Sequence, residues 1–216
     1  MIDTSASRLL SDAADAATAD ALKSYGVTLV TPSVREMGFN RAQNLVQDIA
    51  FEARLHAFYI LHSDAAVTSG AQHLLNFAAR VVRAGWRPPS HGGDEKGSGK
   101  AGVVFFSYDA LALFSPAACL ATGLWDTNFI ADYGADVDFF HRMRTAGFAT
   151  TEGARWGGTV PTVTHEGSHG LHSGEWACAR RLRMDFTFEG EWRGRYLERK
   201  WGAGRNGTVP FVSSPN

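Results

Sequence analysis

The sequence predicts an α/β fold in which a mainly parallel sheet is flanked by helices, within a single domain over residues 1–216. Short, apolar, β-branched runs alternate along the chain with amphipathic helical patterns, and this alternation is typical of a parallel sheet. The length of 216 residues corresponds to about one domain. A content of 44% hydrophobic and 20% charged residues is ordinary for a globular chain with a buried core.

The first half of the chain alternates between helical and strand patterns. We expect helices over residues 7–25, 40–54 and 69–84, and strands over residues 27–31 and 58–61. Asn40 and Ser69 are of residue types that cap the start of a helix, whereas Gly26 and Gly85 are of the type that ends one. These four residues set the expected helix boundaries.

The second half of the chain begins with residues 87–100, which are rich in proline, glycine, serine and charge and predict a flexible loop. Strands are expected over residues 103–107, 110–114 and 159–164, a helix after residue 135, and two amphipathic helices over residues 175–186 and 191–201.

The composition excludes several classes of partner. A formal net charge of -1 gives no basic surface for a polyanion, so we expect no nucleic-acid partner. No apolar run reaches the length of a membrane span or resembles a signal peptide, so the default expectation is a soluble, cytoplasmic protein with no transmembrane segment. Cys119 and Cys178 favour two buried reduced thiols, and a disulfide between them stays open.

Two carboxylates stand at the start of the expected helix after Ala135. Asp136 and Asp138 follow a loop that contains Gly134, so they lie in the first helical turn, where the helix dipole favours ionised side chains. An ionised carboxylate beside a pocket can act as a general base. The alternative is a pair of dipole-stabilising residues without a catalytic role.

A polar tripeptide follows the apolar strand at residues 58–61. His62, Ser63 and Asp64 stand where the strand ends, and ligands of open α/β sheets bind beyond the carboxyl ends of strands. Carboxylate and imidazole groups are both ligands for Mn²⁺. The alternative is a strand-end Asp64 that caps the next turn.

A histidine-rich segment permits three interpretations. His165 follows a β-branched run and can end a strand as a metal ligand. Residues 165–169 also match the zinc-hydrolase motif H-E-x-x-H literally, through His165, Glu166 and His169. That motif requires a helix, and glycines at 167, 170 and 174 would each cost a helix about 1 kcal/mol. The third interpretation is a polar surface loop with incidental histidines.

The segment from Gly123 to Phe148 resembles a family. It is similar to the pattern G-x-F/W-D-x-x-F followed by Y-x-x-D-x-D-L/F-x-x-R-x-x-x-x-G-F/Y of the inverting glycosyltransferases of family 2, which have the GT-A fold. The matching positions are Gly123, Trp125, Asp126, Phe129, Tyr133, Asp136, Asp138, Arg142 and Gly147.

Further segments resemble the same family in the same order. Residues 36–44 are similar to N-x-G-F/Y-x-x-A-x-N, with Glu36 where Asn is usual. Residues 62–64 stand at the D-x-D element, with a histidine in the first position, and His165 fits V-x-H-x-x-x-S. Residues 196–202 match Y-x-x-x-K-W-G. A capped amphipathic helix and a basic terminal helix are the structural alternatives for the first and last of these segments.

The resemblance implies a metal-dependent inverting glycosyltransferase. Such an enzyme moves a sugar from a nucleotide-sugar donor, a UDP- or GDP-sugar, to a hydroxyl acceptor that is expected to be a glycan. It implies Asp136 as the catalytic base. It also implies that His62, Asp64 and His165 hold Mn²⁺ or Mg²⁺. We therefore expect residues 64, 136 and 165 to converge on one cavity.

The resemblance also implies a set of substrate-side residues. These are Asp3, Asn44, Trp125, Asp126, Asp138 and Arg142. Asp3 matches the end of the family's second strand, so the chain is expected to begin one βα unit late, without the first strand. That expectation and His62 favour an alternative, a noncatalytic GT-A-like domain that binds a sugar or a partner. A zinc hydrolase built on residues 165–169 is the third hypothesis.

Overall fold

The computed structural model describes residues 38–62, 65–89, 99–106, 110–129, 134–157, 160–165 and 195–201. The chain divides into two compact units. The first unit comprises Met1–Val46, Trp125–Asp136 and Gly170–Asn216, and the second comprises Gln47–Leu124 and Val137–His169. Asp3, the elements expected over 7–25, 27–31 and 175–186, and most of the loop at 87–100 lie outside the described residues. The expected single domain over residues 1–216 stays a prediction.

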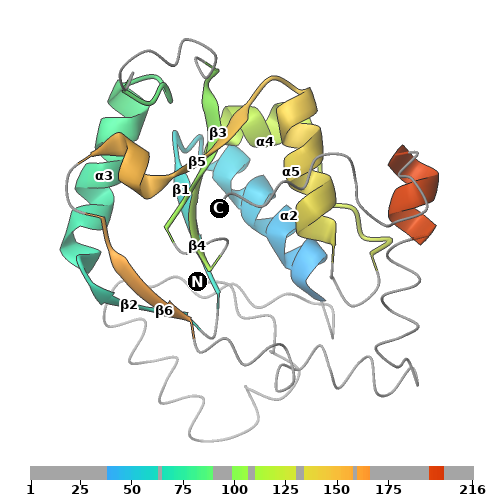
Figure 1. Cartoon of the computed structure of the whole chain (residues 1–216), viewed down its shortest axis with the longest axis horizontal. Helices are drawn as coiled ribbons and strands as arrows, with labels where there is room; N and C mark the ends of the chain where they lie inside the picture. The colour runs from blue at the N-terminus through green and yellow to red at the C-terminus, as the bar shows by residue number, and fades with distance from the viewer. Residues whose placement is uncertain are drawn as a thin grey trace, which may run out of the picture. The chain divides into compact units, whose positions relative to one another are not determined.

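The second unit contains a four-stranded sheet in the order β1-β4-β3-β5 (Figure 1). Its strands are β1 (Phe58–Leu61), β3 (Ala101–Phe105), β4 (Leu111–Phe114) and β5 (Ala149–Glu152). β4 is antiparallel to both β1 and β3, whereas β3 and β5 are parallel. The predicted mixture of helices and a sheet is confirmed.

The prediction that the sheet is mainly parallel is wrong for the described strands. Only residues 106–110 connect β3 to β4, and a parallel pair needs a crossover of about a dozen residues or more. β5 follows β4 through two helices, which is long enough for the parallel pairing of β3 with β5. The sequence at 103–114 already contained the short break that favours a hairpin.

Helices cover both faces of this sheet. On one face, α3 (Leu74–Arg83) places Phe77 and Val81 against Val104 and Leu113, and all four side chains are buried. Every residue of β3 and β4 is buried, as expected of strands between two helical layers.

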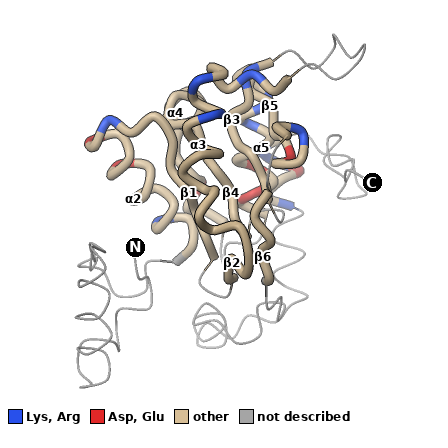
Figure 2. The backbone as a smooth tube through the Cα atoms, turned by 90° about the vertical axis from the view of Figure 1, so that its left-hand side faces the viewer, with Lys and Arg blue, Asp and Glu red and all other residues tan. Residues whose placement is uncertain are grey.

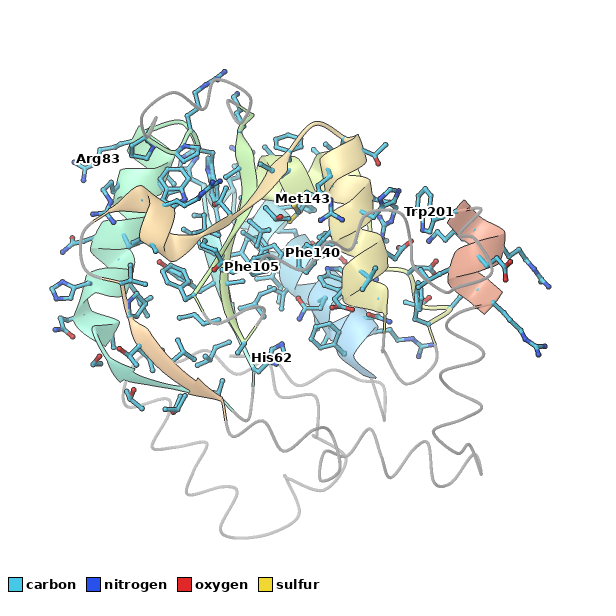
Figure 3. All side chains as sticks on the ribbon, viewed as in Figure 1. His62, Arg83, Phe105, Phe140, Met143 and Trp201 are labelled. Atoms are coloured by element: carbon cyan, nitrogen blue, oxygen red, sulfur yellow. The ribbon has the colours of Figure 1, made fainter. Side chains whose placement is uncertain are left out.

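The opposite face packs against α5 (Ala135–Thr145). Phe140 of α5 meets Phe105 of β3 edge-on, with ring centroids 5.0 Å apart (Figure 3). A Cβ atom on Gly102 would lie 2.5 Å from Sδ of Met143 and 3.0 Å from Cβ of Ala118, so a larger residue here would force the side chain of Met143 to move.

A separate two-stranded sheet pairs β2 (Ala65–Ser69) with β6 (Thr162–His165), antiparallel (Figure 2). The expected helix over residues 69–84 therefore starts later than predicted. Ser69 does not cap it, because it ends a strand and its hydroxyl donates to Oγ1 of Thr162 at 2.9 Å. Gly70, at φ 78°, separates the strand from η1 (Ala71–His73) and α3.

The other helices are α2 (Gly38–Glu52) and α4 (Pro116–Thr122). α2 was predicted, whereas α4 was not. Its signals are present in the sequence: the hydroxyl of Ser115 accepts from the amide of Ala118, and Pro116 occupies the first turn. Residues 195–201 are helical, within the range expected for the last helix. A 3₁₀ turn, η3 (Gly153–Trp156), follows β5.

Cys119 of α4 is a buried free thiol, and burial raises its pKa to about 12. Cys178 lies outside the described residues. Within the described ranges, no helix has the length and apolar character needed to cross a bilayer.

Candidate functional site

Asp126 is the centre of a hydrogen-bonded cluster in the first unit. Its Oδ1 accepts from the backbone amide and from Nδ2 of Asn128, both at 2.9 Å. Its Oδ2 accepts from the hydroxyl of Tyr196 at 2.7 Å and from Nζ of Lys200 at 2.5 Å. A carboxylate has about four acceptor positions, so this one is saturated by protein donors.

This arrangement fixes the charge of Asp126. Burial alone would raise the pKa of the carboxyl group, but the hydrogen bonds from Lys200, Tyr196 and Asn128 outweigh burial and hold the pKa well below its ordinary value. Burial and the neighbouring carboxylate raise the pKa of Tyr196. Asp126 is therefore ionised and Tyr196 is a neutral donor at neutral pH.

The local sequence explains how three segments meet at this carboxylate. Tyr196 and Lys200 are four residues apart in a helical segment, so they share a face. Asn128 reaches Asp126 as residue i+2, which is the pattern of an Asx turn. The ring of Phe129 meets that of Tyr196 edge-on at 4.9 Å. We call Asp126, Asn128, Phe129, Tyr196 and Lys200 the Asp126 cluster.

Lys200 is also surrounded by aromatic rings. Its Nζ lies 5.9 Å from the ring centroid of Phe129, 5.8 Å from that of Tyr196 and 5.6 Å from that of Trp201. Such distances give cation–π attraction in addition to the ion pair with Asp126. The ammonium group is therefore held by one carboxylate and three ring faces.

The start of α2 holds the residue before Asp126. Asn44 donates from Nδ2 to the carbonyl of Trp125 at 3.1 Å, and its Oδ1 accepts from the amide of Trp125 at 2.7 Å. Nδ2 of Asn40 donates to the carbonyl of Asp126 at 3.2 Å. The ring of Phe39 packs edge-on against Trp125, which is only 3% exposed.

These contacts change the interpretation of two residues of α2. Asn40 does not cap the helix as expected, because α2 begins at Gly38 and the side chain of Asn40 is buried against the loop. Asn44, predicted on the substrate side, uses both ends of its carboxamide on the backbone of Trp125. Their spacing of four residues places both on the face of α2 that meets this loop.

Asp138 and Arg142 form a buried ion pair in the second unit. Asp138 is fully buried and accepts from Nε of Arg142 at 2.9 Å. Nη1 of Arg142 donates to the carbonyl of Thr122 at 2.7 Å and thereby joins α5 to the end of α4. These contacts give both predicted substrate-side residues a role in fixing the position of α5.

Asp136 is half-buried and is the second residue of α5. A carboxylate in the first turn of a helix is stabilised in its ionised form by the helix dipole. This position agrees with both roles considered for it, a general base and a residue that stabilises the helix start.

Two of the three predicted metal ligands, His62 and His165, lie next to the β2–β6 pair along the backbone. The amide of Ala65 donates to the carbonyl of His62 at 3.1 Å, and Ala65 is the partner of His165 in the strand register. The backbones of His62 and His165 are thereby brought to the same end of the strand pair. Figure 3 shows His62 just beyond the last residue of β1.

Asp64 and the side chain of His165 lie outside the described residues. Among the side chains that are described, no three from His, Cys, Asp and Glu are grouped so that they could hold a metal ion. His165 lies on a strand, whereas the zinc-hydrolase motif requires both histidines on one helix. The backbone at this position therefore argues against the zinc-hydrolase hypothesis.

A shallow cavity of about 170 Å³ is lined by His73, Asn76, Phe77 and Arg80 of the second unit. None of these four is among the predicted site residues. Arg80 makes contacts with the protein at this cavity: it donates to the carbonyl of Gly157, and its guanidinium lies 4.9 Å from the ring centroid of Phe77.

The comparisons with known proteins do not identify a relative. No family model matches the chain, and it has no match among curated proteins or among solved structures.

Proposed function

We propose that this chain is a metal-dependent inverting glycosyltransferase that moves a sugar from a UDP- or GDP-sugar to a hydroxyl group of a glycan acceptor. One observation carries the proposal. Three segments resemble the family in sequence, and within the first unit the segment at residues 123–148 contacts both others, residues 36–44 through the Asn44–Trp125 hydrogen bond and residues 196–202 through the Asp126–Lys200 hydrogen bond. Such contacts are expected of segments that build one substrate site.

Asp136 is the proposed general base. As the acceptor oxygen attacks the anomeric carbon, the carboxylate takes the proton of the hydroxyl group, and the bond from that carbon to the diphosphate breaks. The new glycosidic bond forms on the face opposite the leaving group, which inverts the configuration. The half-buried place of Asp136 in the first turn of α5 supports this role, because the helix dipole there favours a carboxylate that can accept a proton.

His62, Asp64 and His165 are the proposed ligands of Mn²⁺ or Mg²⁺. Support comes from the register of β2 with β6, in which His165 faces Ala65, the residue after Asp64. Imidazole and carboxylate donors together suit Mn²⁺. When bound, the cation supplies Lewis-acid stabilisation of the charge that develops on the leaving diphosphate.

The remaining substrate-side residues divide by the contacts they make. Trp125 is proposed to shape the acceptor side from beneath the surface, since its ring is only 3% exposed and packs against Phe39, and Asp3 is proposed to contact the nucleoside. Asn44 and Asp126 are proposed to hold the backbone around Trp125 in place. Their polar atoms bind other protein groups, so they are not available to a substrate. Asp138 and Arg142 support α5, which carries Asp136.

Thermal unfolding with UDP, UDP-glucose and GDP-mannose, each with and without Mn²⁺, tests the proposal. A ligand that binds only the folded state raises the unfolding temperature, so we expect a shift with a nucleotide sugar that requires Mn²⁺. No shift with any of these ligands contradicts the proposal. A Mn²⁺-dependent shift without release of UDP in the presence of sugar acceptors favours the noncatalytic sugar-binding alternative, and one tightly bound zinc per chain favours the hydrolase.

A further inference from the structure

We infer that Lys200 and Tyr196 are positioning residues for the loop at residues 125–129, which carries the proposed acceptor-side residue Trp125. The consequence for catalysis rests on the proposed function, whereas the positioning itself does not. The helical segment 195–201 then holds this loop in one conformation, although it lies about seventy residues away in sequence.

The carboxylate of Asp126 is saturated with hydrogen bonds from protein groups. Its two carboxylate oxygens already accept four hydrogen bonds, two from Asn128 and one each from Tyr196 and Lys200. A substrate hydroxyl that bound this carboxylate would have to displace one of these donors. Asp126 therefore acts by fixing the loop at residues 125–129. Tyr196 and Lys200, the two donors from the helical segment 195–201, decide whether this loop is fixed.

The helical segment 195–201 holds the loop at two points. Lys200 and Tyr196 bind the side chain of Asp126, and the ring of Tyr196 packs against Phe129 three residues later. Only 24% of the Lys200 side chain is exposed, and three rings surround its ammonium group, so this lysine is restrained far more than a surface lysine.

A different element, α2, holds the beginning of the loop. Asn44 of α2 binds both the amide and the carbonyl of Trp125, independently of the helical segment 195–201. Loss of Lys200 should therefore loosen the part of the loop that depends on the carboxylate of Asp126, above all the amide of Asn128, which donates to Oδ1. The amide of Trp125 keeps its bond to Asn44.

Amide hydrogen exchange of the full chain tests the inference without any substrate. We compare Lys200→Met with Lys200→Arg, which keeps the charge, and with Arg199→Met, an exposed neighbour on the same helical segment. We expect Lys200→Met to speed exchange within residues 126–129 by about tenfold, while the two other variants stay near the wild-type rate. Unchanged exchange in Lys200→Met, or an equal increase in Arg199→Met, overturns the inference.

A milder variant covers the case in which Lys200→Met does not fold. Tyr196→Phe removes only the hydroxyl group and keeps the ring against Phe129. It should speed exchange of the same amides by a smaller factor, while the buried strands β3 and β4 serve as the internal reference. If Tyr196→Phe leaves the exchange of the loop amides unchanged, the hydroxyl group of Tyr196 does not position the loop, and the inference is contradicted.

A kinetic measurement distinguishes positioning from general destabilisation. With UDP-glucose, Mn²⁺ and methyl β-glucoside as probes, Lys200→Met should raise the KM for methyl β-glucoside several-fold and leave the KM for UDP-glucose unchanged. An equal rise in both values contradicts an acceptor-side role. If the wild-type chain transfers no sugar, the proposed function fails, and the exchange measurement alone still decides whether Lys200 positions the loop.

Discussion

The carboxylate of Asp126 accepts a hydrogen bond from the ammonium group of Lys200 at 2.5 Å, across 74 residues of sequence. Tyr196 adds a second donor to the same oxygen at 2.7 Å. The helical segment 195–201 is therefore anchored to the 125–129 loop by a charged, largely buried contact. The stability of the first unit should depend on this contact.

Asp126→Asn should lower the free energy of unfolding by about 1.5–3 kcal/mol at pH 7, because Lys200 and Tyr196 lose a charged acceptor. Urea unfolding measures the change. The exposed Asp48→Asn on α2 is the matched control and should alter stability little. Equal stability of Asp126→Asn and the wild-type chain would show that the cluster contributes nothing to folding.

The effect of Asp126→Asn should depend on pH. The folded state lowers the pKa of Asp126 below the ordinary value of 3.8, so it favours the ionised form more strongly than the unfolded state does. That stabilisation is fully present above the ordinary pKa and is lost as the pH falls below it. Urea unfolding from pH 7 to about pH 3 should therefore show the wild-type advantage shrinking below about pH 4. If the stability advantage of the wild-type chain over Asp126→Asn instead grows as the pH falls, the lowered pKa of Asp126 is contradicted.

Asn44→Ala should destabilise the chain by about 1–3 kcal/mol, because it removes both hydrogen bonds to the backbone of Trp125. Asn76→Ala, at an exposed position of α3, provides the control for loss of a helical asparagine. Chemical denaturation of the two variants gives the comparison. If the Asn76 variant loses as much stability as the Asn44 variant, the two bonds to Trp125 are not the cause.

Arg142→Met should destabilise the chain by about 3–5 kcal/mol, because it removes the ion-pair partner of the fully buried Asp138. The double variant Arg142→Met with Asp138→Asn should recover part of this loss, since a neutral amide then replaces the buried carboxylate. A double-mutant cycle from urea unfolding measures the coupling. Strictly additive effects would show that the pair is energetically independent.

The strand at residues 58–61 was predicted with its observed boundaries, because a short apolar run with polar ends needs no knowledge of the rest of the chain. β2 was missed, because Ala65–Ser69 carries no strong strand pattern and its partner β6 lies almost a hundred residues later. Alternation of helices and strands predicted the α/β class, but the direction of β4 depends on the length of one connection.

In the candidate site too, local motifs could be found in the sequence, whereas the contacts between distant segments could not. Asn44, Asp126 and Lys200 each stood out in the sequence as part of a local motif. Their mutual contacts were not predictable, since a single sequence gives the face that a residue occupies and not the distant segment that packs there. Tyr196 and Lys200 offered one usable signal, a spacing of four residues that puts a hydroxyl and an ammonium group on the same helical face.

The proposed sugar transfer is tested most directly by turnover of Asp136→Asn with UDP-glucose, Mn²⁺ and a hydroxyl acceptor. We expect the wild-type chain and the exposed control Asp48→Asn to release UDP and form a glycoside of inverted configuration. Asp136→Asn should retain Mn²⁺-dependent binding of UDP and lose transfer by at least about a hundredfold, as expected for removal of a general base. Transfer by Asp136→Asn at the wild-type rate would contradict the account.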